Sequence, residues 1–103
     1  MTTNIIKVSI IIRTINEESW IGKCISAIKK QSISNYEIII VDDKSTDQTA
    51  KIAMEMVNSF HQISFLQNKR NLGTGGAFQE GIKKATNDYV IFVPFDNPLD
   101  KED

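Results

Sequence analysis

Polar side chains follow three short apolar segments of this chain, and each set begins where its segment ends. The apolar segments are residues 8–12 (VSIII), 38–41 (IIIV) and 89–93 (YVIFV), and the polar residues that follow lie in 13–17 (RTINE), 42–45 (DDKS) and 94–97 (PFDN). Asp42 and Asp43 are adjacent carboxylates, which repel each other unless a positive or hydrogen-bonding group lies between them. Each set can be read as helix caps and turns, but the acidic pair favours a binding site.

The residue types limit which ligand such a site can hold. Cys24 is the only cysteine and His61 the only histidine, so the chain can form neither an internal disulfide nor a Cys/His zinc site. Carboxylate and amide oxygens instead suit Mg²⁺ or Mn²⁺. The 12 Lys and Arg residues are scattered and stand against 13 Asp and Glu, so the net charge of -1 predicts no nucleic-acid partner.

The hydropathy pattern contains no segment for membrane insertion or export. No apolar stretch approaches the roughly 20 residues of a membrane-spanning helix, and the first residues lack a signal-peptide pattern. We therefore expect a cytoplasmic protein, which could lie at the inner face of the membrane as part of a longer chain. The length of 103 residues predicts a single domain over residues 1–103.

Helical patterns separate the apolar segments. These segments and a weaker fourth, residues 63–66 (ISFL), are rich in β-branched or aromatic residues and nearly continuous, which is typical of strands buried on both faces. Between them, apolar residues recur at helical spacing and should pack in the core: Trp20, Ile21, Cys24, Ile25 and Ile28, then Ile52, Ala53, Met56, Val57 and Phe60, then Phe78, Ile82 and Ala85. The alternation β-α-β-α-β-α-β predicts an α/β fold, a three-layer Rossmann-like parallel sheet with helices on both faces.

Start signals precede the predicted helices. Asn16 is expected to cap the first helix, and Ser45 with Gln48 has the spacing of a capping box before the second. The third helix is expected to begin near Thr74.

The glycine-rich segment NLGTGGAFQEG does not fit the dinucleotide-binding pattern G-x-G-x-x-G, and no G-K-[ST] follows it. Gly73 is instead expected in a turn with positive φ, and Gly81 where the helix packs closely against the sheet. Backbone N–H groups near Thr74 could still meet an anion at the helix start.

In an open parallel sheet, ligands bind beyond the carboxyl ends of the strands. The segments VSIIIRTINEE, EIIIVDDKSTDQT, NLGTGGAFQEGIKKA and YVIFVPFDN stand at or next to these ends. Together, and in this order, they resemble the N-terminal, donor-binding half of a family-2 glycosyltransferase with the GT-A fold. The resemblance covers residues 8 to about 100.

The resemblance implies a fold and a set of site residues. It implies the strand order 3-2-1-4 and a nucleotide site formed by Arg13, Thr14, Asn16, Glu17, Asp42, Asp43, Ser45, Asn71 and Gly73. Within this set, Asp43 would contact the base and Asp42 would support it. Asp96, with Asn97 as a second oxygen ligand, would hold Mg²⁺ or Mn²⁺. The donor would be a nucleotide sugar, most simply a UDP-sugar, in a metal-dependent transfer such as those of cell-surface polysaccharide synthesis.

Three residues depart from the family's pattern. Arg13 stands where many members have proline, Ile15 where many have an aromatic residue that stacks on the base, and Pro94 where the first metal-binding acid stands. The second leaves base affinity or identity open, and the third leaves Asp96 as the expected direct ligand.

The resemblance implies transfer of a sugar to an acceptor hydroxyl. The expected catalytic base and acceptor half would lie beyond Asp103, so these 103 residues should be inactive alone, as a piece of a longer enzyme or a short chain that has lost catalysis. An alternative is a non-catalytic nucleotide-binding or scaffold module of the same fold. A phospho-receiver domain fits less well, because its acidic pair follows the first strand. The edge strand, residues 89–93, would be left uncovered and is expected to form a homodimer.

Overall fold

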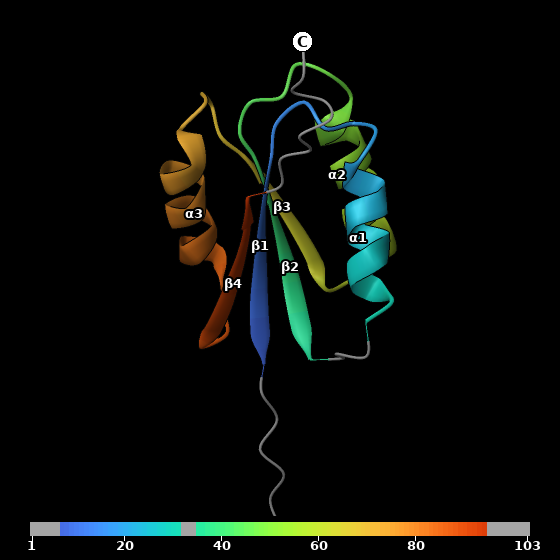
Figure 1. The fold of residues 1–103 in the computed structure, drawn as a ribbon, viewed down its shortest axis with the longest axis vertical. Helices are drawn as coiled ribbons and strands as arrows, with labels where there is room; N and C mark the ends of the chain where they lie inside the picture. Colours follow the sequence, from blue (N-terminus) through green and yellow to red (C-terminus); the bar gives the residue numbers. More distant parts are fainter. Residues whose placement is uncertain (1–6, 32–34, 95–103) are drawn as a thin grey trace, which may run out of the picture.

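The computed structural model describes residues 7–31 and 35–94, in which strands and helices alternate along the whole length (Figure 1). The elements are β1 (Val8–Thr14), α1 (Ile21–Lys29), β2 (Tyr36–Asp42), α2 (Thr49–Ser59), β3 (Ile63–Gln67), α3 (Gly73–Lys84) and β4 (Tyr89–Pro94). All four predicted strands and all three predicted helices are therefore confirmed.

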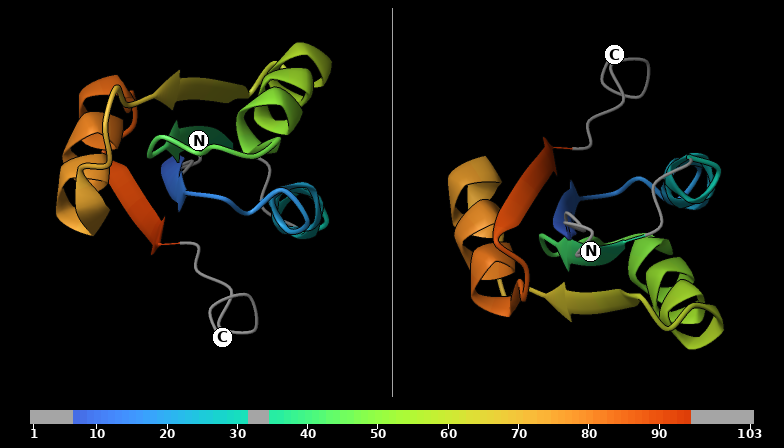
Figure 2. Two further views of the ribbon diagram at one scale, coloured as in Figure 1. Left: turned by 90° about the horizontal axis from the view of Figure 1, so that it is seen from above. Right: turned by 90° about the horizontal axis from the view of Figure 1, so that it is seen from below.

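The strands form one parallel sheet in the order β3-β2-β1-β4. Seen along the strands, α1 and α2 lie on one side of the sheet and α3 lies on the other (Figure 2). The predicted three-layer architecture and strand order are confirmed. Because all strands run in the same direction, the loops that leave their carboxyl ends gather at one edge of the sheet, at the upper end in Figure 1.

The core has two parts, one on each face of the sheet. Isoleucines of β1 and β2 alternate between the faces, because successive strand residues point in opposite directions. The larger cluster packs them against α1 and α2 and contains Ile10, Ile12, Ile21, Ile25, Ile38, Ile40, Ala53 and Ile63. The smaller cluster lies under α3 and contains Ile11, Ile39, Val41 and Ala77. Burial on both faces, at about 1.5–3 kcal/mol for each large side chain, explains the nearly continuous apolar runs.

Both predictions about glycines are confirmed. Gly73 has a φ of 77°, a conformation that other residues rarely adopt, at the first position of α3. Gly81 lies where α3 meets the sheet, and a Cβ atom there would stand 2.4 Å from Cγ2 of the buried Ile11. The helix can therefore approach β1 closely only because this position carries no side chain.

Both predicted N-terminal caps are wrong. Helix α1 begins at Ile21, its N-cap is Trp20, and Asn16 lies earlier in the loop with a φ of 51°. Asn16 does not reach the helix because its side chain bonds the neighbouring loop instead. The capping box does not form either, because Ser45 donates its hydroxyl proton to Asp42.

Helix α2 receives its side-chain capping bond from Asp47, which is not part of the predicted capping box. Its N-cap is Gln48, which makes no side-chain cap, and Asp47 Oδ1 accepts the N–H of Thr49 at 2.9 Å. Helix α3 begins at Gly73, one residue before the predicted start. Among its predicted core residues, Phe78 and Ala85 pack under the helix, whereas Ile82 is 41% exposed and its core assignment is wrong. No helix within residues 7–31 and 35–94 has the length and apolar character needed to cross a membrane.

Candidate functional site

The carboxyl ends of β1, β2 and β3 bring the predicted polar residues to one edge of the sheet, which we call the rim. Thr14 stands beside Asp42 in the register of β1 and β2, and Arg13 stands beside Val41. Because side chains alternate, Asp42 faces the α1/α2 side and Asp43 faces α3. The two carboxylates therefore point apart, and each meets its own set of hydrogen-bond donors.

Asp43 is fully buried and is the most heavily bonded residue of the rim. Its Oδ1 accepts the side-chain amide of Asn68 at 3.0 Å and the N–H of Leu72 at 2.8 Å. Its Oδ2 accepts the N–H of Gly73 at 3.0 Å and Nε of Arg13 at 3.0 Å, and Nη2 of Arg13 lies 2.9 Å from the same oxygen. One carboxylate thus joins the ends of β1 and β3 to the start of α3.

These contacts set the charge state of Asp43. Burial by itself raises the pKa of the carboxyl group, but the Leu72 N–H, the Asn68 amide and the Arg13 guanidinium together hold this pKa below its ordinary value. Asp43 is therefore ionised at neutral pH. Its charge is neutralised by Arg13 and by the positive end of the α3 dipole.

Arg13 lies over this carboxylate, and its side chain is 15% exposed. Its Nη2 also donates to Oδ1 of Asn71 at 3.4 Å, and the same Oδ1 accepts the N–H of Gly73 at 2.9 Å. Asn71 itself is exposed. Arg13 and Asn71 therefore lie on the solvent side of the buried Asp43 carboxylate.

Asp42 fixes the loop that follows β2. Its Oδ2 accepts the N–H of Ser45 and the side-chain amide of Gln67, each at 2.9 Å, and its Oδ1 accepts the hydroxyl of Ser45. The loop also contains Lys44 at a φ of 75°, an unusual value for a residue other than glycine. The carboxylate holds a turn that would otherwise be unfavourable.

The loops after β1 and β2 are bonded to each other through the remaining predicted residues. Oδ1 of Asn16 accepts the N–H of Thr46 at 2.8 Å, and the N–H of Asn16 donates to Oγ of Ser45 at 2.9 Å. The N–H of the buried Glu17 donates to the hydroxyl of Thr49 at 2.9 Å. Asn16, Glu17 and Ser45 therefore position the rim, whatever ligand it binds.

Two residues whose side chains contact the acidic pair were missed by the sequence reasoning. Gln67 and Asn68 stand at the end of β3, and their side-chain amides donate to Asp42 and Asp43 respectively. The signal was present, because polar residues directly after the segment ISFL occupy the same edge of the sheet as those after the other strands.

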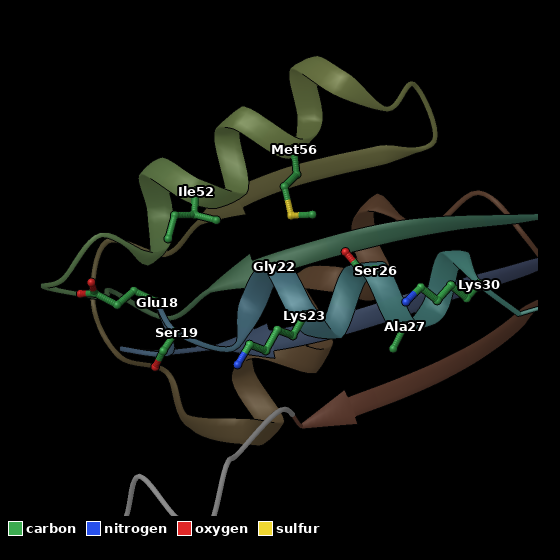
Figure 3. A pocket seen from close by; sticks show the side chains of 9 residues that line it. All are labelled: Glu18, Ser19, Gly22, Lys23, Ser26, Ala27, Lys30, Ile52 and Met56. Atoms are coloured by element: carbon green, nitrogen blue, oxygen red, sulfur yellow. The ribbon is translucent and has the colours of Figure 1, made fainter.

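The hollows near the rim differ in character. One of about 460 Å³ adjoins the rim at the loop after β3 and is lined by Gln67, Asn68, Lys69, Arg70, Leu72 and Glu80. Another of about 540 Å³ lies between α1 and α2, and Figure 3 shows the nine residues that line it: Glu18, Ser19, Gly22, Lys23, Ser26, Ala27, Lys30, Ile52 and Met56. The first is lined by Gln67, Asn68 and Leu72, which bond the acidic pair, whereas the second is a groove between helices, so we place the candidate site at the rim.

The described residues do not fit a metal ion. Within residues 7–31 and 35–94, no three His, Cys, Asp or Glu side chains come together in a way that could hold one. Both oxygens of Asp42 and of Asp43 already accept N–H or O–H groups, which leaves neither free for a cation. The predicted ligands Asp96 and Asn97 lie outside the described residues.

Comparison with known proteins identifies a family. A family model described as "Glycosyl transferase family 2" matches residues 9–101. The chain is 30% identical over 96 residues to glycosyltransferase GlyA of Streptococcus pneumoniae, a match that covers 93% of this chain and 14% of GlyA. It is 41% identical over 88 residues to a dolichyl N-acetyl-alpha-D-glucosaminyl phosphate diacetamido-dideoxy-glucuronosyltransferase of Methanococcus voltae, covering 82% of this chain and 27% of that protein. The chain thus spans about a quarter or less of these curated relatives.

Solved structures share the fold. The structure of residues 1–349 of Staphylococcus aureus TarS in complex with UDP has a TM-score of 0.78 at 32% identity, over 86% of this chain and 27% of that one. A Pyrobaculum calidifontis mannosyltransferase in complex with GDP-Man and Mn²⁺ has a TM-score of 0.76 at 23% identity, over 82% of this chain and 26% of that one.

Proposed function

Because this chain belongs to glycosyl transferase family 2, we propose that its rim binds the nucleoside diphosphate part of a sugar donor. The observation that carries the proposal is the convergence of three strand ends on one bonded cluster around Asp42 and Asp43. A ligand site in an open parallel sheet is expected at this edge. The whole protein would then transfer the sugar to an acceptor hydroxyl.

The charges around the rim suit a diphosphate. The guanidinium of Arg13 and the amide of Asn71 lie at its outer surface, and Lys69 and Arg70 line the adjoining hollow. Such N–H donors pair well with phosphate oxygens, which only accept hydrogen bonds. Because Asp43 is neutralised by Arg13, it does not repel an incoming anion. These features support binding of the diphosphate next to the loop that follows β3.

A uridine donor is the finer proposal. The family resemblance implies it, and TarS, whose structures have been solved with UDP and with UDP-GlcNAc, supports it at 32% identity. The nine predicted residues would have different roles at the site. Asn16, Glu17, Asp42 and Ser45 would shape the loops. Arg13, Asn71 and Gly73 would stand next to the ligand, and the buried Thr14 and Asp43 would support the site from beneath.

A divalent cation, Mg²⁺ or Mn²⁺, is a further part of the proposal. Its ligands would be Asp96 and Asn97, which are outside the described residues. Such an ion would neutralise the charge that develops on the diphosphate leaving group. Support comes from the Mn²⁺ in the structure of the Pyrobaculum mannosyltransferase.

Calorimetric titration with UDP, with and without Mn²⁺, tests the proposal. Asn71→Ala removes an exposed rim amide and should weaken binding about fivefold, the usual effect of one hydrogen bond. Asn58→Ala, which changes an exposed amide on α2, is the matched control and should bind like the parent. Asp96→Ala should remove only the part of the affinity that Mn²⁺ adds. If Asn71→Ala binds UDP as the parent does, the assigned site is wrong.

A non-catalytic scaffold is the second candidate. The full bonding of both carboxylates favours it, because such a cluster stabilises the loops without any ligand. A scaffold of this kind need not bind a nucleotide. The absence of any heat of binding with UDP and Mn²⁺, from a chain shown to be folded, would favour this candidate over the first.

We also propose that the chain forms a homodimer through β4. This strand pairs only with β1, so its other edge carries backbone groups without a partner strand among the described elements. Tyr89 is 62% and Ile91 48% exposed, and an apolar hollow of about 550 Å³ lies between Val93 of the same strand and α1. A second copy could pair antiparallel with the free edge and cover these side chains.

Sedimentation tests the dimer. Ile91→Lys should shift the chain toward monomer, whereas Met54→Lys, which changes an equally exposed apolar residue on α2, should not. A parent chain that sediments as a monomer at high micromolar concentration would refute the interface.

A further inference from the structure

Lys44 has a backbone conformation that its residue type does not favour. Its φ is 75°, in the left-handed region that glycine alone adopts without steric cost. Among residues 7–31 and 35–94, Asn16 is the only other non-glycine residue with a positive φ. Asparagine tolerates this region, and the Asn16 side chain bonds the N–H of Thr46. Lysine has no such short polar group, so its presence here needs another reason.

Hydrogen bonds on both sides of Lys44 impose this conformation. The N–H of Asp43 donates to the carbonyl oxygen of Thr14 at 2.9 Å, and the N–H of Ser45 donates to Oδ2 of Asp42 at 2.9 Å. The hydroxyl of Ser45 bonds the same carboxylate. Because the chain is held before and after position 44, a side chain there adds strain that glycine would not.

The side chain of Lys44 has no partner within the described fold. The residue is exposed, and its ammonium group makes no hydrogen bond or ion pair with any part of residues 7–31 and 35–94. The neighbouring carboxylates do not use it, because Asp43 is paired with Arg13 and Asp42 accepts neutral donors at both oxygens. Contacts within the fold therefore do not offset the strain at this position.

The order of the strands places Lys44 between the other cations of the rim. In the sheet, β2 lies between β3 and β1. The loop that follows β2 and carries Lys44 is therefore flanked by Arg13 in β1 and by Lys69 and Arg70 after β3. An anion that extends along the rim from one of these groups to the other passes the end of β2.

We infer that Lys44 is a further binding residue for the phosphate groups of the donor, kept at the rim in a conformation that lowers the stability of the fold. The inference rests on the proposed nucleotide site and adds to it a residue that no bond within the fold requires. Residues in strained conformations occur preferentially at binding and catalytic sites. An ammonium group donates up to three hydrogen bonds, and phosphate oxygens accept them.

The test measures the melting temperature and the dissociation constant of UDP, which should change in opposite senses. Lys44→Gly removes the strain, so the melting temperature should rise by about 2–6 °C. The same change removes the cation and should weaken UDP binding about tenfold, the lower part of the range for a hydrogen bond to a charged group. Lys44→Arg keeps a cation on the same backbone and should stay close to the parent in both quantities. Lys51→Ala, which removes an exposed cation from α2, is the matched control and should bind UDP as the parent does.

Salt separates a direct contact between charges from a change in the shape of the loop. Raising the NaCl concentration from about 20 mM to about 200 mM should weaken UDP binding to the parent more than to Lys44→Gly, because salt screens exposed charges. A variant that had only altered the loop would keep the salt dependence of the parent.

The outcomes separate this inference from the proposed function. If Lys44→Gly binds UDP as the parent does, if Lys44→Arg loses as much affinity as Lys44→Gly, or if the salt dependence is equal, the role of Lys44 is overturned and the nucleotide site stays in place. A melting temperature of Lys44→Gly that does not rise overturns the claim of strain. A folded parent chain that binds no UDP overturns the nucleotide site and this inference with it.

Discussion

Replacing Asp43 with asparagine keeps the size of the side chain but removes its charge and one of its two acceptor oxygens. In either orientation, the new amide group would point at donors, either at Asn68 and the Leu72 N–H or at Arg13 and the Gly73 N–H. At least two bonds are lost, and the guanidinium of Arg13 loses its counter-charge.

The magnitude follows from burial. Removing one partner of a buried ion pair costs about 3–5 kcal/mol. Arg13 is 15% exposed and can regain some water, which puts the loss near the lower figure, about 3 kcal/mol. The total free energy of unfolding of a chain of this size is roughly 5–15 kcal/mol, so this loss is a large part of it. At about 4–8 °C for each kcal/mol, the melting temperature should fall by about 12–24 °C.

Urea unfolding followed by the fluorescence of Trp20, the only tryptophan, measures this loss. Asp88→Asn, a change at an exposed residue just before β4, is the matched control and should stay within about 0.5 kcal/mol of the parent. A loss below about 1 kcal/mol for Asp43→Asn would refute the idea that this carboxylate holds the rim together.

Two further predictions concern the core and the pH. Gly81→Ala should destabilise the fold by about 1–2 kcal/mol, because the strain against Ile11 exceeds the gain in helix propensity. Gly75→Ala, with open space around the new methyl group, should instead stabilise the fold by about 0.5–1 kcal/mol. Chemical unfolding measures both changes, and a stabilising Gly81→Ala would contradict the close packing. Because folding lowers the pKa of Asp43, its ionised form contributes stability that is complete above the ordinary pKa of 3.8 and is lost as the pH falls through the folded pKa. The free energy of unfolding, measured at pH 5, 4 and 3, should therefore fall more steeply for the parent than for Asp43→Asn. Equal pH dependence in the two proteins would contradict this.

The fold was predictable because its signals are local. Runs of β-branched residues such as IIIV are typical of strands buried on both faces of a parallel sheet, and Gly81 interrupts a helix where close packing against Ile11 requires a glycine. The residues that follow the first two strands could be expected to lie close together, because parallel strands end at a common edge.

The details of the rim were not predictable, because they depend on contacts between distant segments. Asn16 and Ser45 have the side chains of helix caps, but loop-to-loop bonds outweigh the local capping. Arg13 and Asp43 are 30 residues apart, and no local pattern marks their pairing. The roles of Asp96 and Asn97 stay predictions, since both residues lie outside the described segments.

The central claim is that the carboxyl edge of the sheet is the nucleotide site. Its most direct test is to map the amide chemical shifts of the isotope-labelled chain during titration with UDP. We expect the shifts to cluster in residues 13–17, 43–46 and 67–73, and residues 35–37 and 85–88 at the opposite edge to stay unchanged. Shifts confined to the opposite edge or to the groove between α1 and α2, or none at millimolar UDP, would contradict the claim.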